Sequence, residues 1–145
     1  MGLREANRQV VKAYLEIEGN AVEQRMALFH PEIMYEIVHT MECRPERTCG
    51  KEKVRERFLK NAKHWKDFCY SRVKLWACDD PNVFIAECDG TAEIISPMFT
   101  KPRPYKNYYY IMFVMRDGAI WQLRQFTNPM KLIHDFWCEM PDVCK

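Results

Sequence analysis

The sequence predicts an α+β fold in which a curved, largely antiparallel sheet wraps a long helix and leaves a cavity at its open end. Two observations carry this prediction. Apolar residues recur at helical spacing through much of the first third of the chain, whereas the second half alternates with the period of two that is typical of strands. Two helices, one strand, a third helix and then a meander of three to four strands make an α+β arrangement.

The first strand is expected after two helices. Apolar residues from Val10 to Ile17 repeat with helical period. Gly19-Asn20 ends this helix, because glycine is the usual residue beyond a helix C-terminus. A second short helix over residues 21–29 stops at His30-Pro31, since the residue before a proline disfavours helical geometry. Side chains from Ile33 to Val38 then alternate with the period of a strand.

A third helix precedes the meander. Residues Lys51 to about Lys63 follow helical spacing, and we expect the sheet to pack on this helix while the N-terminal helices close one side. The meander strands are predicted over residues 70–78, 83–95, 105–115 and 119–127. A candidate bulge interrupts the second of them at Cys88-Asp89-Gly90. Arg116-Asp117-Gly118 makes a hairpin turn, and Asn128-Pro129 caps a final helix from Met130 to Trp137.

Composition indicates one domain spanning residues 1–145, with enough apolar residues (48%) to bury a core. The 22 basic and 20 acidic residues nearly cancel, whereas nucleic-acid binding usually shows a concentrated basic face. The basic residues between Arg44 and Lys60 alternate with glutamates, which favours a solvated surface over a phosphate-binding patch. We therefore expect no nucleic-acid partner.

The seven cysteines are odd in number, and they form neither a CxxC motif nor a Cys/His cluster with zinc-site spacing. We therefore expect the thiols to be reduced and the protein to be cytoplasmic. Charges interrupt every apolar run before it reaches membrane-spanning length, so no membrane partner is expected. No flavin, nucleotide or metal motif is visible, and we expect no cofactor.

A specific resemblance begins at the long second meander strand. The run Asp79 to Gly90 is similar to one in the PhzA/PhzB phenazine-biosynthesis proteins. Further similar pieces follow in the same order and at matching spacing: Val10-Val11-Lys12, Leu28-Phe29, Gly50-Lys51, Tyr105-Lys106-Asn107, Asp117-Gly118 and Arg124 to Asn128. The collinear set covers the chain from about Asn7 to about Leu132, and none of its pieces is a catalytic motif by itself.

This resemblance implies a cone-shaped, SnoaL-like α+β fold, shared with nuclear transport factor 2, the SnoaL-type cyclases and the ketosteroid isomerases. It also implies a homodimer. The chemistry of the family is a head-to-tail condensation of two aminocyclohexenone carboxylates into a tricyclic phenazine precursor. Such a reaction needs cations that hold the carboxylates, two reactants held face to face, and a group that moves a proton.

Four positions carry the family's site roles onto this sequence. Arg25 matches a basic position suited to holding a carboxylate with its planar guanidinium. Arg57 stands where the family has a pocket histidine, and Asn61, one helical turn later, stands where it has a serine. Gln125 replaces the acidic general acid/base in the last strand. An amide cannot exchange a proton near neutral pH, so the replacement places the phenazine-forming reaction itself in question.

Other candidates come from alternation along the strands. Trp121, Leu123 and Gln125 share one parity and are expected to face the interior, where Gln125 is either a core amide bonded to the backbone or a ligand contact. Which face of residues 105–115 points inward stays open. Flat apolar walls are expected from four aromatic residues: Tyr35, Trp65, Tyr110 and Trp121. His39, of the same parity as Tyr35, is the candidate to move a proton.

The leading hypothesis is a pocket protein that binds or transforms a cyclic or aromatic carboxylic acid. One alternative is a non-catalytic ligand-binding or partner subunit that has lost its acid at Gln125. Another is a SnoaL-like isomerase or cyclase that uses a different acid, such as Glu36. The many aromatic residues of the meander lead us to expect dimerisation through the outer face of the sheet.

Overall fold

The computed structural model describes residues 1–40 and 44–137 of the chain. In chain order the elements are α1 (Leu3–Glu16), α2 (Val22–Ala27), β1 (Phe29–Ile37), β2 (Glu46–Cys49), α3 (Lys51–Ala62), β3 (Trp65–Ala77), β4 (Val83–Ile94), β5 (Arg103–Arg116), β6 (Ala119–Thr127) and α4 (Pro129–Trp137).

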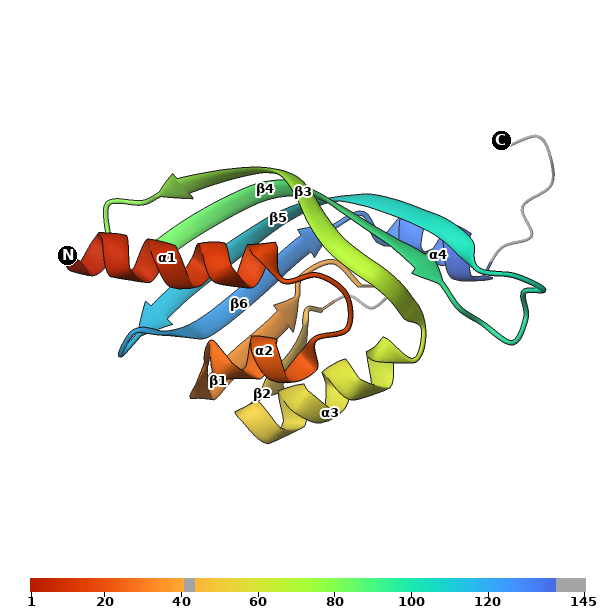
Figure 1. The fold of residues 1–145 in the computed structure, drawn as a ribbon, viewed down its shortest axis with the longest axis horizontal. Coiled ribbons are helices and arrows are strands. Elements are labelled where there is room, and N and C mark those ends of the chain that lie inside the picture. Colours follow the sequence, from red (N-terminus) through yellow and green to blue (C-terminus); the bar gives the residue numbers. More distant parts are fainter. Residues whose placement is uncertain (41–43, 138–145) are drawn as a thin grey trace.

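The six strands form one curved sheet in the order β2-β1-β6-β5-β4-β3 (Figure 1). β1 runs parallel to β6, and every other neighbouring pair is antiparallel. The predicted α+β class with a curved, mixed sheet is confirmed.

The helix that the sheet wraps most closely is α1. It lies along the sheet in Figure 1 and contacts β3 and β6. Its residues Val11, Tyr14 and Leu15 are buried, whereas Val54 is the one buried residue of α3. α3 packs beside α2 against β1 and β2 and closes one end of the sheet. The expectation that the sheet packs mainly on the third helix was therefore only partly right.

β3 has two irregularities that contribute to the curvature of the sheet. Its pairing with β4 shifts twice, between Lys66 and Cys69 and between Ser71 and Lys74. Asp67 and Arg72 adopt positive φ values of 56° and 50° at these two irregularities. Bulges of this kind bend a strand and increase its twist. The candidate bulge at residues 88–90 was wrong, because β4 pairs with β5 in unbroken register from Val83 to Ile94; the irregularity belongs to the partner strand.

A further irregularity, in β6, reverses the predicted orientation of Trp121. Met115 pairs with Ile120 and Val114 pairs with Gln122, so Trp121 is the extra residue of a bulge. Ile120 and Leu123, three residues apart, are both fully buried. The bulge therefore interrupts the period of two, and the Trp121 ring lies under the guanidinium of Arg116, 3.5 Å from its carbon atom.

Gly90 occupies a position on β4 where a side chain would not fit. A Cβ built there would overlap the ring of Tyr109 on β5 and lie 3.2 Å from Cζ of Phe68 on β3. The ring of Tyr109 therefore packs directly over the backbone of β4. At the β5–β6 turn, Asp117 and Gly118 have φ values of 52° and 75°, as the predicted hairpin requires.

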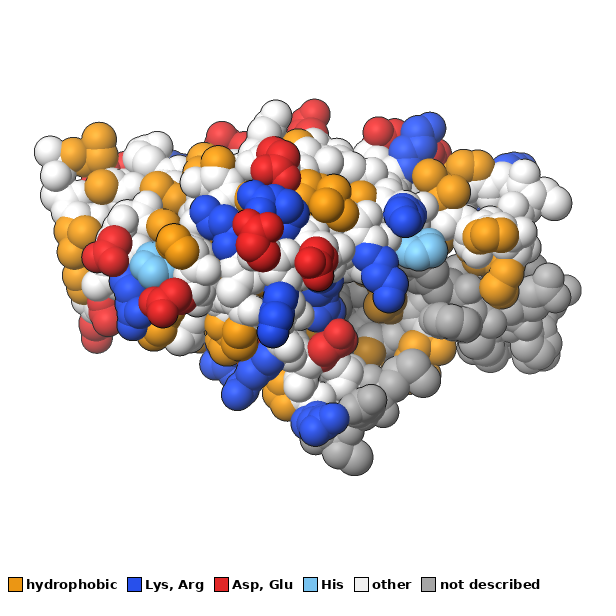
Figure 2. All heavy atoms as spheres, turned by 90° about the horizontal axis from the view of Figure 1, so that it is seen from below, with side chains coloured by type: hydrophobic (Ala, Val, Ile, Leu, Met, Phe, Trp, Pro, Cys, Tyr) orange, Lys and Arg blue, Asp and Glu red, His pale blue; other side chains and the backbone are white. Residues whose placement is uncertain are grey.

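The surface agrees with the prediction of a solvated charged face. Figure 2 shows acidic and basic side chains interspersed over the face seen from below. Arg55 of α3, for example, pairs with Glu52 on its own helix and with Glu23 of α2, at 2.9 Å. In the described part of the chain, no helix is long and apolar enough to cross a membrane.

Candidate functional site

A cavity of about 470 Å³ lies between the helices and the inner face of the sheet. This volume is within the range of roughly 300–1,000 Å³ typical of small-molecule sites. α1, α2 and α3 contribute walls on one side, and inward-facing residues of β1, β3, β5 and β6 line the other. Pro129, Leu132 and Ile133 of α4 complete the lining.

Seven of the nine residues singled out in the sequence line this cavity: Arg25, Tyr35, His39, Arg57, Asn61, Trp65 and Gln125. The other two lie elsewhere. Tyr110 is 45% exposed and points from the opposite face of β5, and Trp121 is turned away by the bulge in β6. The question of which face of β5 is internal is thereby answered, because Tyr105 and Tyr109 are buried and line the cavity.

Arg25 places a buried positive charge in the cavity wall. The residue is 7% exposed, and its guanidinium donates to the main-chain oxygens of Gly19 (2.8 Å) and Ile17 (3.4 Å). Within residues 1–40 and 44–137, no carboxylate forms an ion pair with it. A buried charge needs a partner to offset its desolvation, so this wall suits an anionic ligand.

Arg57 is a second cation in the cavity, and it has protein partners. It donates to Thr48 Oγ1 at 2.9 Å and pairs with Glu46 at 3.1 Å. Its guanidinium carbon also lies 5.2 Å from the centre of the Tyr35 ring. Glu46, 61% exposed in its side chain, is the one carboxylate among the described residues that line the cavity. These contacts hold the guanidinium of Arg57 in the cavity wall.

Gln125 meets Tyr35 inside the cavity. The hydroxyl of Tyr35 donates to Oε1 of Gln125 at 3.4 Å. The parallel pairing of β1 with β6 places Ile37 beside Gln125 and Tyr35 beside Leu123, which brings the two side chains to one face. Because the amide oxygen accepts from Tyr35, the NH₂ group of Gln125 can donate to a ligand. His39 lies at the edge, with its ring 5.9 Å from that of Phe126.

Aromatic rings form the deep wall, and most of them were missed in the sequence. Trp65 packs on Tyr105 at 4.7 Å between ring centres, and Tyr70 packs on Tyr109 at 5.8 Å. The hydroxyls of Tyr105 and Tyr109 are 2.7 Å apart. Burial raises the pKa of all of these phenols and also that of Tyr14. They are therefore neutral at physiological pH and act as hydrogen-bonding groups rather than as anions.

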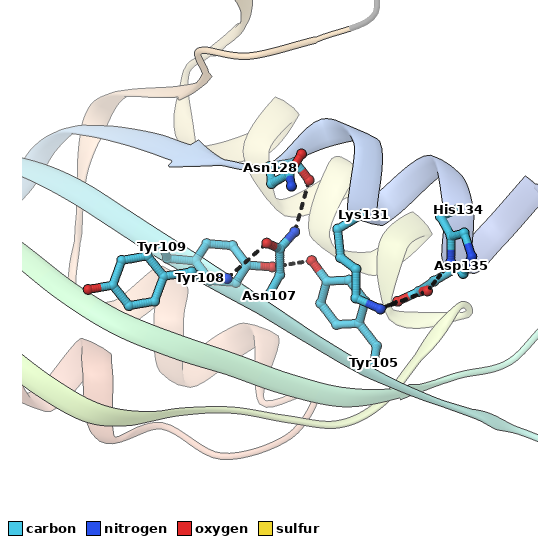
Figure 3. Close-up of polar contacts among 8 residues, drawn as sticks. All are labelled: Tyr105, Asn107, Tyr108, Tyr109, Asn128, Lys131, His134 and Asp135. Atoms are coloured by element: carbon cyan, nitrogen blue, oxygen red, sulfur yellow. Dashed lines mark hydrogen bonds and ion pairs between the residues drawn. The ribbon is translucent and has the colours of Figure 1, made fainter. Parts of the chain in front are cut away.

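A hydrogen bond from β5 ties the start of α4 to this wall (Figure 3). Nδ2 of Asn107 on β5 donates to the main-chain oxygen of Asn128 at 3.0 Å, immediately before the helix. On α4 itself, Asp135 pairs with Lys131 at 2.8 Å and with His134 at 2.9 Å. In the part of the chain described, no three His, Cys, Asp or Glu side chains gather as metal ligands would.

Glu36 does not face the cavity. It alternates with Tyr35 on β1, lies on the opposite side of the sheet and is fully buried there between Arg47 of β2 and Arg124 of β6. Burial by itself raises the pKa of this carboxyl group, but hydrogen bonds and charges from the two arginines outweigh burial and leave the pKa below its ordinary value. The proposal that Glu36 is the acid of an isomerase or cyclase was therefore wrong.

Comparison with known proteins gives a consistent result. The family described as phenazine biosynthesis protein A/B matches residues 1–145. Phenazine biosynthesis protein PhzB1 of Pseudomonas aeruginosa is 28% identical over 97% of this chain and 86% of its own length. The crystal structure of PhzB2 from the same organism superposes with a TM-score of 0.86, at 28% identity, over 97% of this chain and 90% of that one. A candidate isomerase of Bacillus subtilis, 20% identical, shares the fold with a TM-score of 0.78 over 94% of this chain and 96% of that one.

Proposed function

The chain belongs to the phenazine biosynthesis protein A/B family, and from that premise we propose that its cavity binds, or binds and transforms, a cyclic or aromatic carboxylic acid. The observation that carries the proposal is Arg25, a buried guanidinium in the cavity wall that no described carboxylate neutralises. A ligand carboxylate is the partner that its charge and planar donor geometry fit best. The flat rings of Tyr35 and Trp65 supply walls for a planar ring.

The other polar side chains take separate roles in this proposal. Arg57, which Glu46 and Thr48 hold in place, adds a second positive charge. This charge lies either beside the ligand carboxylate or at the entrance of the cavity. Asn61 lies one helical turn beyond Arg57 and lines the same cavity. Asn61 and the NH₂ group of Gln125 orient carbonyl or amine groups of the ligand.

Gln125 limits the chemistry. An amide neither gives nor takes a proton near neutral pH, so Gln125 acts by orientation and not as a general acid. Any turnover in this site then depends on positioning, with His39 or a group of the substrate moving the proton. If neither suffices, the chain is a ligand-binding or partner subunit without activity of its own.

A second candidate function is favoured by Glu46. An isomerase or cyclase needs a carboxylate that faces the ligand, and among the described residues of the cavity wall Glu46 meets that condition. Its ion pair with Arg57 at 3.1 Å counts against the role, because the carboxylate is already engaged by the guanidinium. Glu46→Gln abolishes turnover if Glu46 is the base, and leaves ligand binding in place if it only orients Arg57.

Calorimetry tests the main proposal. Wild-type protein is titrated with cyclic keto- and amino-carboxylates and, as matched controls, with their methyl esters. We expect binding of the acids and at least tenfold weaker binding of the esters, since the ester cannot pair with Arg25. Arg25→Met should remove this preference. Equal affinity for acid and ester, or binding of neither, would contradict the assignment of the cavity.

A further inference from the structure

The loop between α1 and α2, residues 17–21, supplies protein partners to Arg25. Nη1 of Arg25 donates to the main-chain oxygen of Gly19 at 2.8 Å, and Nη2 donates to that of Ile17 at 3.4 Å. A guanidinium carries five N–H groups, so these two bonds leave three for a ligand. The direction in which those three N–H groups point therefore depends on the position of the loop.

The side chain of Asn20 attaches this loop to two other elements. Its Nδ2 donates to the main-chain oxygen of Trp65 at 2.6 Å and to that of Ala62 at 3.2 Å. Ala62 is the last residue of α3, where carbonyl groups have no partner within the helix, and Trp65 begins β3. The loop passes beside these two elements in Figure 1. Asn20 therefore joins the loop to the end of α3 and to the start of β3.

Gly19 connects the same loop to β3 through its main chain. Its φ of 68° lies in the left-handed region that glycine adopts readily. In this conformation its N–H donates to the main-chain oxygen of Phe68 at 2.7 Å, while its own oxygen accepts from Arg25. A substitution at Asn20 would leave the bond to Phe68 in place. Such a variant should keep the fold and lose the side-chain attachment of the loop.

The attachment lies between the two parts of the cavity that a cyclic acid must contact together. Gly19, Asn20, Arg25 and Trp65 all line the cavity. A cyclic acid has a fixed separation between its ring and its carboxylate, so the site must hold a cation and a ring wall at a fixed separation. Asn20 bonds directly to Trp65, and its neighbour Gly19 bonds directly to Arg25. The loop therefore sets the position of the guanidinium relative to the ring wall.

We propose that Asn20 is a positioning residue that fixes the guanidinium of Arg25 relative to the ring wall at Trp65 and thereby strengthens the binding of a carboxylate. The inference rests on the proposed function, since it takes the ligand carboxylate to pair with Arg25. Asn20 acts through the loop and needs no contact with the ligand. Loss of its amide should weaken the binding of a charged acid more than that of a neutral analogue.

Calorimetry with cyclohexanecarboxylate and its methyl ester measures this preference. Asn20→Ala removes the amide, and Asn82→Ala is the matched control. Asn82 also joins two parts of the fold, because its Oδ1 accepts from Asn7 of α1 at 3.0 Å, but it lies outside the cavity lining. We expect Asn20→Ala to lower the acid-to-ester ratio of affinities about three- to tenfold, the effect of one or two lost hydrogen bonds. The affinity for the ester, and the ratio in Asn82→Ala, should stay at their wild-type values.

Nuclear magnetic resonance of the free protein tests the same inference without a ligand. The ¹⁵N resonances of the Arg25 guanidinium can be assigned by their absence from the spectrum of Arg25→Met. In the wild type, the bonds to Gly19 and Ile17 should restrict rotation of the guanidinium and keep its two Nη resonances separate at low temperature. The two resonances should merge in Asn20→Ala and stay separate in Asn82→Ala.

The outcomes separate this inference from the proposed function. An unchanged acid-to-ester ratio in Asn20→Ala, unchanged Arg25 resonances, or the same changes in Asn82→Ala would each overturn the inference and leave the carboxylate site standing. Equal affinity of the wild type for acid and ester would overturn the proposed function, and with it the role of Asn20 in carboxylate binding. The Arg25 resonances would then still show whether Asn20 holds the guanidinium.

Discussion

The hydroxyl of Tyr35 reaches Oε1 of Gln125 across the parallel β1–β6 pair, at 3.4 Å inside the cavity. Gln125→Glu would put a carboxylic acid at this point with almost no change of shape. In a wall lined by aromatic side chains, such a group can exchange protons near neutral pH. We expect the variant to condense an aminocyclohexenone carboxylate, generated in situ, about 10²–10⁴-fold faster than the wild type. The measurement is formation of the tricyclic product.

The wild type is its own reference in this experiment, with Gln122→Glu as a control on the same strand outside the cavity lining. A gain confined to residue 125 supports a site that lost its acid. Similar turnover in wild type and Gln125→Glu would mean that another group, such as His39, moves the proton. In that case the His39→Ala variant should lose the activity.

Glu36 should make the free energy of unfolding depend on pH in the acidic range. Because its pKa is lowered in the folded state, its contribution is full above the unfolded value of about 4.3 and is lost as the pH falls through the folded value. We expect Glu36→Gln to cost about 1–3 kcal/mol of unfolding free energy at pH 7 and progressively less below about pH 4. Urea denaturation at several pH values measures this. Glu32→Gln, at an exposed position of the same strand, should show almost no difference at any pH.

We expect the protein to form a dimer in which the outer face of the sheet packs against a second copy of the chain. Trp76, Tyr108 and Tyr110 are 47%, 41% and 45% exposed there, and aromatic residues are enriched at interfaces between subunits. Light scattering at micromolar concentration should give twice the mass of one subunit. Tyr110→Lys should shift the protein toward the monomer, whereas a wild type that already has the mass of one subunit would refute the expectation.

The thiols should react in an order set by burial. Cys49 is exposed, while Cys69, Cys78 and Cys88 are partly or fully covered, and all four are free. Burial, with the neighbouring charges of Asp89 and Glu87, raises the pKa of Cys88 to about 12, so its thiolate is scarce. Alkylation of native protein followed by mass spectrometry should label Cys49 first and Cys88 last. Disulfides in freshly purified protein would contradict the proposed cytoplasmic location. Cys43, Cys138 and Cys144, also expected to be free, lie outside the described residues.

Part of the cavity wall could be predicted from the sequence. Tyr35 and Gln125 follow from alternation along regular strand segments, whereas Arg57 and Asn61 were identified through the family resemblance, and helical spacing adds that they share one face. The predicted inward orientation of Trp121 was wrong because a bulge inserts one extra residue into β6. Nothing in the local sequence indicates which residue will form a bulge. The Tyr105–Tyr109 pair was missed for a different reason. The tyrosines of β5 point to both faces, and only the packing of β4 and α4 distinguishes the two sets.

Gly90 influences the width of the cavity from a position outside the cavity lining. This residue does not line the ligand space, yet the ring of Tyr109 occupies the volume that a side chain at position 90 would fill. Alanine there would push the ring of Tyr109, with its hydroxyl, toward the ligand and narrow the cavity, while leaving Arg25, Arg57 and Gln125 in place. A change at this one position of β4 could therefore set the size of ring that the protein accepts, independently of the two arginines.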